Sequence, residues 1–456
     1  MNLRSARAIL ASTCVLFALV QIAAFRWGVI TPDSVVQYGQ ALSGQYDDWH
    51  PPITAWLWRQ LLRFGTGGAP FLLLDVALYW GAIGLIADRI AVRHGVCWAA
   101  APMLIGMLPI PFGQIGAILK DPLMACLLLM AVALLVRGEE ARGWLRRFAL
   151  PLILVAAATR INAPFAALPL LLLWLPQGWT MSPGRIVASA SIAIAVLLAS
   201  GWTINQAMLR PHHSQPIFSL INFDLAGIIA QGGPNLYPTL GTAEARAFTA
   251  ACYEPKLYGA RDADHCAFPE DSLAAYAARS GASPVGLWLS AILAAPGPYL
   301  RHRLEHVDLN WRLAVAGVPD DAVYMMSEPN PFGLRFTPNA LTHAVVGAAR
   351  AMAWSPLGRP ATWLAVALGL LIAAPRLKSR PLVTALAASA LLYGGAYAVV
   401  SVSTDLRYNL WTMLAAMLGL AFALVEGAQL SRRRMVAASA PLLLVVMLEV
   451  GGLLAG

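Results

Sequence analysis

Residues that could carry out chemistry are concentrated in one stretch of the sequence, residues 31–52, which reads TPDSVVQYGQALSGQYDDWHPP. It directly follows the first apolar segment and contains Asp33, Asp48 and His50. A carboxylate placed here could act as a general base toward an attacking hydroxyl group. Unpaired charge at a membrane boundary is costly, so such residues usually have partners and a function. Taken alone, the stretch could equally be a solvated loop.

Further polar groups occur at the ends of other apolar segments and favour the functional interpretation. They are Lys120 with Asp121, Arg160 with Asn162, Arg301 with His302, Arg303 and His306, and Asp405 with Arg407 and Tyr408. A lone cation at such a place is more often an interfacial anchor. Several cations on one membrane surface, however, suit a lipid phosphate, which Arg can bind through two parallel hydrogen bonds. Beside a carboxylate, they suit transfer of a sugar from a lipid phosphate to an acceptor hydroxyl.

The composition places the elements that must position these residues in a membrane. The chain has 456 residues, of which 59% are hydrophobic and only 12% charged, and its mean hydropathy is +0.64. Soluble domains carry roughly twice that charged fraction. We therefore predict an all-α polytopic membrane protein. The net charge of +9 is attributed to cytoplasmic loops and not to nucleic-acid binding, because Lys and Arg accumulate in such loops.

Apolar segments predict about eleven transmembrane helices. The first seven are expected at residues 8–25, 69–87, 96–112 and 121–136, as two short spans within 148–174 that meet at Arg160, and at 186–204. The last four are expected at about 356–373, 381–400, 411–425 and 435–454. The first segment could also be a signal peptide, but the chain after it is equally apolar. A short interfacial helix is predicted within residues 53–64.

These segments divide the chain into three predicted parts. Residues 1–204 form an N-terminal membrane module, in which residues 26–68 are a catalytic first external loop. Residues 205–355 are polar, with no sustained apolar run, and are expected to form a small external domain that is α or mixed. Residues 356–456 form the C-terminal membrane helices.

The basic turns predict the orientation of the chain. With a cytoplasmic N-terminus, every strongly basic turn falls inside. These turns are residues 88–94, 137–147, 185, 376–380 and 432–434. The polar groups and the large loop then face outward. The short loops and the absence of an N-x-[ST] acceptor site fit a bacterial inner membrane, with the active face in the periplasm.

One motif resembles a known family. The residues Asp48-Trp49-His50-Pro51-Pro52 resemble the D-x-H-P-P segment in the first external loop of protein O-mannosyltransferases. The whole pattern resembles the GT-C superfamily of polyprenyl-phosphate-sugar glycosyltransferases, which includes the aminoarabinose transferases of lipid A. Those enzymes have an acidic residue just after the first span, interfacial helices in the first loop and a soluble domain after the seventh span. The resemblance is architectural over most of the chain and extends to a motif only within residues 33–52.

The resemblance implies roles for several residues. Asp33 is expected to be the general base, and His50 is expected to be a catalytic residue with it. Many relatives begin this loop with two adjacent acids, whereas Asp33 is followed by Ser34, so Asp48 is expected only as a supporting acid. The lipid phosphate is expected to bind Lys120, Arg160 and Arg407, although Lys120 could instead pair with Asp121. Other possible substrate contacts are Tyr38, Asp121, Asn162, Arg301, Arg303, His306, Asp405 and Tyr408.

The expected partners are a polyprenyl-phosphate-linked sugar, a glycan, lipid or protein acceptor, and membrane lipid, with no nucleic acid. No cofactor is expected. Asp33, Asp48 and His50 could ligate a divalent metal, but a monophosphate surrounded by cations has less need of one, so we predict that no metal is used.

Two other functions stay open from the sequence. A flippase or transporter of a lipid-linked glycan should place ionisable residues at the bilayer midplane on broken, repeat-related helices. Here these residues are found at the ends of apolar segments. An O-antigen ligase or polymerase, which uses a diphosphate-linked donor, would share the external loop and is poorly separated by sequence.

The chain has five cysteines. Cys14, Cys97 and Cys126 lie in apolar segments and are predicted to be free, buried thiols. Cys252 and Cys266 lie in the large polar region. If that region faces an oxidising periplasm they should form a disulfide; otherwise they are two loop thiols.

Overall fold

The computed structural model describes residues 3–138, 143–256, 266, 268–317, 321–325, 327, 329–427 and 430–455. Within these ranges every regular element is a helix, and pairing of extended backbone is limited to two isolated bridges, Val29 with Ala117 and Asp47 with His212. The all-α prediction is therefore confirmed for the described residues.

Six apolar helical segments of the described chain are long enough to cross a membrane. They are built on α1 (Leu3–Ala24), α4 (Ala69–His94), α7 (Lys120–Gly138), α10 (Pro183–Trp202), α20 (Leu410–Val425) and α21 (Arg432–Ala455). A transmembrane helix needs about 20 predominantly apolar residues. These six helices indicate a multi-pass membrane protein.

The other five predicted spans form shorter helices. They correspond to α5 (Ala100–Met107), α8 (Gly143–Ala158), α9 (Ala163–Trp174), α18 (Pro360–Ala373) and α19 (Arg380–Ala396). The segment 96–112 is not one helix, because the chain leaves the helical conformation at Leu108 and Pro109 starts the separate helix α6 (Pro109–Gln114). Proline has no backbone N–H to continue a helix. The segment 148–174 does contain parts of two helices, with Arg160 in the turn between α8 and α9; that both cross the membrane stays a prediction.

The six long helices divide into inner and outer ones. Most residues of α4, α7 and α20 are buried, whereas most residues of α1, α10 and α21 are exposed. The exposed side chains of the outer helices are largely apolar, for example Leu16, Val187 and Leu443. Exposed apolar surface on long helices is what a hydrocarbon environment requires. The inner helices pack on one another and on α8, α18 and α19.

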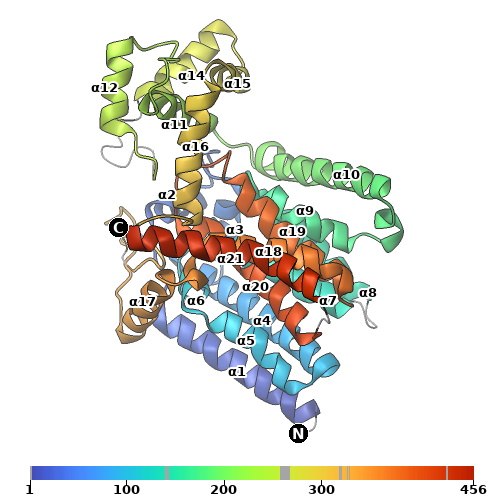
Figure 1. Ribbon diagram of the computed structural model, residues 1–456. Coiled ribbons are helices and arrows are strands. Elements are labelled where there is room, and N and C mark those ends of the chain that lie inside the picture. The colour runs from blue at the N-terminus through green and yellow to red at the C-terminus, as the bar shows by residue number, and fades with distance from the viewer. Residues whose placement is uncertain are drawn as a thin grey trace.

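A second group of helices has its own apolar core. It consists of α11 (Ile217–Ala230), α12 (Thr242–Cys252), α14 (Phe268–Ser280) and α15 (Pro284–Ala294). Phe218, Ile221, Leu225 and Leu273 lie in this core. Figure 1 shows this group at one end of the molecule, with α16 (Pro296–Trp311) running from it to the membrane helices. No helix that begins among the described residues of 205–355 is long and apolar enough to cross a membrane, although α11 and α15 are short apolar helices that the sequence analysis did not expect.

The last part of the same region packs on the membrane helices. α17 (Ala340–Ala353) contacts α6 and α1. The Asn339 side chain caps α17 and also donates to the carbonyl oxygen of Ala23, and Thr342 donates to that of Ala24. These bonds hold α17 at the end of α1.

The cysteines behave in two ways. Cys252 and Cys266 are joined in a disulfide, with their Cα atoms 5.7 Å apart. Cys14 and Cys126 are buried free thiols, but Cys97 is exposed. The prediction of a buried Cys97 is wrong because this residue lies in the single turn η1 (Val96–Ala99), after α4 has ended.

The disulfide gives a prediction about the purified protein. Unreduced peptide mass spectrometry should find Cys252 and Cys266 linked in protein taken from its native membrane. Reduction should lower the free energy of unfolding by around 3 kcal/mol, because the bridge closes a loop of about 15 residues. Free thiols at both positions would contradict an oxidising environment for this region.

Candidate active site

Asp33 lies in the first turn of α2 (Pro32–Ser43). Thr31 and Ser34 form a reciprocal capping box, and Pro32 occupies the first helical position, so the helix must begin here. The hydroxyl of Ser34 also donates to the carbonyl oxygen of Ile118 at 2.6 Å. This bond fixes the start of α2 against the residues that lead into α7. The partial positive charge at a helix N-terminus favours a carboxylate there.

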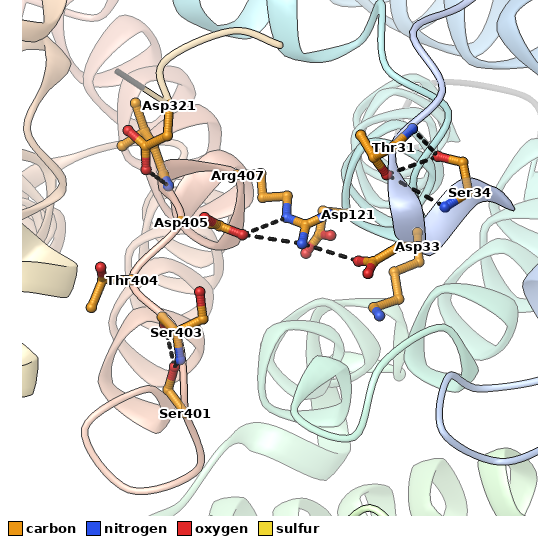
Figure 2. Close-up of polar contacts among 12 residues, drawn as sticks. Thr31, Asp33, Ser34, Asp121, Asp321, Ser401, Ser403, Thr404, Asp405 and Arg407 are labelled. Atoms are coloured by element: carbon orange, nitrogen blue, oxygen red, sulfur yellow. Dashed lines mark hydrogen bonds and ion pairs between the residues drawn. The ribbon is translucent and has the colours of Figure 1, made fainter. Parts of the chain in front are cut away.

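Arg407 lies between two carboxylates (Figure 2). One terminal nitrogen of its guanidinium, Nη2, is 3.0 Å from Asp33 Oδ2 and 3.1 Å from Asp405 Oδ2. Its other terminal nitrogen, Nη1, is buried and has no hydrogen-bond partner in the described part of the chain. The Arg407 side chain is 10% exposed and that of Asp33 is 27% exposed. The pair thus combines a spare guanidinium donor with a carboxylate that a substrate can reach.

His50 and Lys120 complete the contacts around Asp33. Lys120 Nζ donates to His50 Nδ1 at 2.6 Å, so the ring hydrogen is assigned to Nε2. His50 Nε2 is 3.6 Å from Asp33 Oδ1, which is too long for a hydrogen bond but close enough for electrostatic attraction. Burial lowers the pKa of His50, and the charge of Lys120 lowers it further against the opposing effect of Asp33. The ring is therefore neutral at pH 7. Asp33, His50, Lys120, Asp405 and Arg407 are called the Asp33 cluster below.

The Asp33 carboxyl is held ionised. Burial on its own would raise its pKa, but the neighbouring His50 ring and the charges of Lys120 and Arg407 together outweigh that effect. The pKa of Asp33 is consequently well below its ordinary value. Contacts that depend on its charge are present above the unfolded-state pKa of about 3.9 and are lost as the pH falls through the lower folded-state value.

We expect Asp33 and His50 to cause no fall in kcat/KM between pH 8 and about 6.5. Over this range Asp33 stays ionised and His50 stays neutral. Arg407→Ala removes one of the charges that lower the pKa of Asp33. The pH at which kcat/KM falls on the acidic side should therefore be higher in this variant than in the wild type. A pH–rate profile of both proteins tests this. A tenfold fall in wild-type kcat/KM between pH 8 and 6.5 would assign the base to another group.

Arg160 forms the adjoining part of the site. Its guanidinium pairs with the buried Asp121 carboxylate, and its Nε donates to Asn162 Oδ1 at 3.3 Å. The question left open by the sequence is settled by these contacts: Asp121 pairs with Arg160, and Lys120 contacts His50 instead.

Tyr408 lies between the two arginines. Its ring centroid is 4.5 Å from the guanidinium carbon of Arg160 and 5.3 Å from that of Arg407. It also stacks on Tyr397, with centroids 5.4 Å apart. The structure therefore brings Lys120, Arg160 and Arg407 together from three separate turns. Their role as phosphate ligands remains a prediction.

Arg303 and His306 belong to a different buried group, centred on Asp224. Arg303 Nη2 and His302 Nε2 are 2.5 and 2.8 Å from Asp224 Oδ1. His306 bonds to the carbonyl oxygen of Pro255, while Arg301 is exposed and donates to that of Gln231. No hydrogen bond or ion pair joins these residues to the Asp33 cluster in the part of the chain that the structure describes.

The segment 401–407 links the two groups. Arg303 donates to the carbonyl oxygen of Ser401 at 2.7 Å, and Asn310 donates to that of Ser403 at 3.3 Å. Farther along, the Thr404 amide donates to the carbonyl oxygen of Lys256, and the Leu406 amide donates to Asp321. The segment that carries Asp405 and Arg407 is therefore held by contacts with α16 and with residues Lys256 and Asp321.

Two predicted site residues have structural contacts instead. Asp48 accepts hydrogen bonds from His213 and from the Ser214 amide. Tyr38 packs against Trp58 and Phe332, and its hydroxyl accepts from the Gly67 amide. Both shape the first loop, and neither has a hydrogen bond or ion pair with the Asp33 cluster in the described ranges.

Several residues of the site were missed by the sequence analysis. Tyr397 stacks on Tyr408, the Tyr324 ring lies 5.7 Å from the guanidinium carbon of Arg407, and Asp321 pairs with Arg312. Asp224 could have been found, because a lone carboxylate inside an apolar helix usually has a buried partner. Nothing in the spacing of the tyrosines distinguishes them from ordinary core residues.

Two carboxylates also lie inside apolar helices, away from their ends. Asp75 in α4 is fully buried, and both of its oxygens are without a hydrogen-bond partner among the described residues. Glu449 in α21 accepts a hydrogen bond from Thr362. The expectation that ionisable residues sit only at the ends of apolar segments is therefore wrong for these two.

The described residues contain no group of three or more His, Cys, Asp or Glu side chains that could hold a metal ion. The prediction that the reaction needs no metal is left for experiment.

Comparison with known proteins gives one similarity. No family model matches the chain, and no curated protein matches it. One solved structure is similar, the archaeal oligosaccharyltransferase AglB from Archaeoglobus fulgidus in complex with an inhibitory peptide and a dolichol-phosphate. The sequences are 14% identical and the TM-score is 0.36. The alignment covers 97% of this chain but 56% of that one, so this chain spans little more than half of its length.

Proposed function

We propose that this protein is an integral-membrane glycosyltransferase that moves a sugar from a polyprenyl phosphate to a hydroxyl group of a glycan, lipid or protein acceptor. The main support is the Asp33–Arg407 contact. A reachable carboxylate and a guanidinium with a spare donor lie side by side where α2 and α20 begin. One group can take a proton while the other holds the departing phosphate.

The proposed reaction is a single displacement at the anomeric carbon. The acceptor oxygen attacks this carbon as its proton passes to the Asp33 carboxylate. The bond from the anomeric carbon to the phosphate oxygen breaks, and its electron pair stays on the phosphate. Lys120, Arg160 and Arg407 stabilise the charge on the leaving lipid phosphate.

Arg407 contacts Asp33 and is also a proposed ligand of the donor phosphate, so donor binding would change the basicity of Asp33. Arg407 is the counter-charge of Asp33, and it contributes to the low pKa of that carboxyl. A phosphate bound to Arg407 competes with Asp33 for the guanidinium. The partial loss of this counter-charge raises the basicity of Asp33. In this mechanism the donor itself prepares the base for the acceptor.

The proposed orientation follows from the basic turns. Lys120 begins α7, and Arg137 lies at its other end beside Asp88 and Arg7. If the basic end is cytoplasmic, the Asp33 cluster faces the periplasm, as do α11 to α16. In this proposal all eleven apolar helices are embedded in the bilayer, the short ones among the longer ones.

Purified protein and defined lipids test the proposal. Polyprenyl phosphates carrying different single sugars are incubated with the protein and a set of glycan, lipid A and peptide acceptors. The expected result is acceptor-dependent release of polyprenyl phosphate with formation of the glycosylated acceptor. Activity only with a polyprenyl-diphosphate donor would indicate a ligase or polymerase. Movement of the intact donor across a proteoliposome membrane without transfer would indicate a flippase.

A further inference from the structure

A large cavity lies at the opposite end of the helical bundle from the Asp33 cluster. Its volume is about 1440 Å³. Lys120 and the cavity residues Val136 and Gly138 are at the two ends of α7. With 19 residues and 1.5 Å per residue, this helix is about 28 Å long. The basic end of the cavity is thus separated from the proposed reaction by almost the thickness of a bilayer core, while its walls extend along α9 and α19 as far as Leu168 and Leu392.

One end of the cavity is strongly basic. Its basic lining residues are Arg89, Arg93, His94, Arg146, Lys378 and Arg380. Among the lining residues of the described chain, the sole carboxylate is that of Glu426, which accepts the backbone N–H groups of Lys378 and Ser379 at 2.8 and 3.0 Å. That carboxylate is therefore used to cap the turn before α19, and the balance of charge in the cavity is positive.

Two of these cations are available for a ligand. Arg146 is already used, because its guanidinium donates to the carbonyl oxygens of Leu173, Trp174 and Leu175. By contrast, the side chains of Lys378 and Arg380 have no hydrogen bond or ion pair in the described part of the chain. They stand at the start of α19 on an exposed turn.

The walls of the cavity are apolar. Leu168 and Leu172 of α9 line it together with Ile186 and Ala190 of α10. α10 is one of the outer helices with mostly exposed apolar side chains. A soluble anion would use the basic end and leave these walls in contact with water. A lipid would use both, because its phosphate meets the cations while its acyl chains cover the leucines.

We propose that this cavity binds an anionic phospholipid, with its headgroup phosphate held by Lys378 and Arg380 and its acyl chains lying between α9, α10 and α19. Basic pockets between transmembrane helices are a recurring form of anionic-lipid site. The headgroup position is separate from the proposed reaction, and binding there needs neither donor nor acceptor.

Lipid titration of the purified full-length protein in detergent tests the proposal. The probes are phosphatidylglycerol, phosphatidylcholine with the same acyl chains, and inorganic phosphate, with native mass spectrometry for affinity and Tm for stabilisation. Phosphatidylglycerol should bind one molecule per chain and raise Tm, while the other two should not. Equal stabilisation by phosphatidylcholine or by inorganic phosphate would overturn the proposal.

Matched variants locate the site. The double variant Lys378→Gln/Arg380→Gln should weaken phosphatidylglycerol binding by at least about tenfold, because two charge-assisted contacts are lost. Arg432→Gln/Arg433→Gln removes the same charge from exposed residues at the start of α21 and should bind like the wild type. Ala388→Phe narrows the cavity without changing charge and should also weaken binding. A lipid-free Tm equal to that of the wild type shows that a variant is folded. Wild-type affinity in both cavity variants would overturn the assignment.

Discussion

Asp33→Asn should reduce sugar transfer by on the order of 10²-fold or more while leaving donor binding largely intact. The amide keeps the volume of the carboxyl group but cannot accept the acceptor's proton. It also removes the carboxylate that holds Arg407 at 3.0 Å, so the guanidinium becomes more available to the phosphate. The loss should therefore appear in kcat, with the Kd for the donor unchanged or lower. Single-turnover transfer and donor titration measure the two quantities separately.

A charge-matched control accompanies this variant. Asp271→Asn makes the same chemical change at an exposed position of α14 and should transfer sugar like the wild type. Near-normal turnover in purified Asp33→Asn would end the assignment of Asp33 as the base. Equal losses in both variants would point to a general effect of charge rather than to a base.

Arg407→Ala should weaken donor-lipid binding by roughly 1.5–3 kcal/mol, which corresponds to about 10-fold to 150-fold in Kd. The side chain is mostly buried, and its free Nη1 donor faces no other partner among the described residues. Arg160→Ala should have an effect of the same size. Unlike Arg407, Arg160 leaves a buried partner behind, Asp121, so this variant needs a check of its Tm. Isothermal titration with the polyprenyl phosphate product gives the affinities.

Conservative replacement separates charge from geometry. Arg407→Lys keeps the positive charge near Asp33 but cannot offer two parallel donors to a phosphate, so it should recover part of the lost affinity. Arg301→Ala is the control, since Arg301 is exposed and bonds only to the Gln231 carbonyl oxygen. If Arg407→Ala and Arg160→Ala both bind the lipid like the wild type, the phosphate site lies elsewhere.

The sequence predicted the positions of the membrane helices better than it predicted their lengths. Each of the eleven apolar segments that hydropathy predicted contains helix, because burial in hydrocarbon or in a core requires the same side chains. Hydropathy did not distinguish six long helices from five short ones. Pro109 was the visible signal that the segment 96–112 is broken. Helix α11 is apolar for another reason. It belongs to the small core formed with α12, α14 and α15, and such a core uses the same residue types as a membrane helix.

The sequence predicted several of the residues that gather at the candidate site, but it did not predict which of them contact one another. Counting basic turns was enough to place Asp33, Lys120, Arg160 and Arg407 on one face, since a helix that crosses the membrane alternates between the two sides. Which carboxylate pairs with which cation depends on helix rotation and tilt, which are set by packing. Arg303 was expected as a possible substrate contact on the same face, but its guanidinium pairs with one buried carboxylate in α11, Asp224.

The segment 401–407 has a consequence for how two substrates would act on one protein. It is fixed by α16 through Ser401 and Ser403, and its last residue is the arginine that contacts Asp33. A force that tilts α16 is therefore transmitted along six peptide units to the guanidinium. An acceptor that binds α16 and displaces it would shift the donor's affinity, and by thermodynamic reciprocity the donor would shift the acceptor's affinity by the same factor. Segment 401–407 would then couple binding at α16 to binding at the Asp33 cluster.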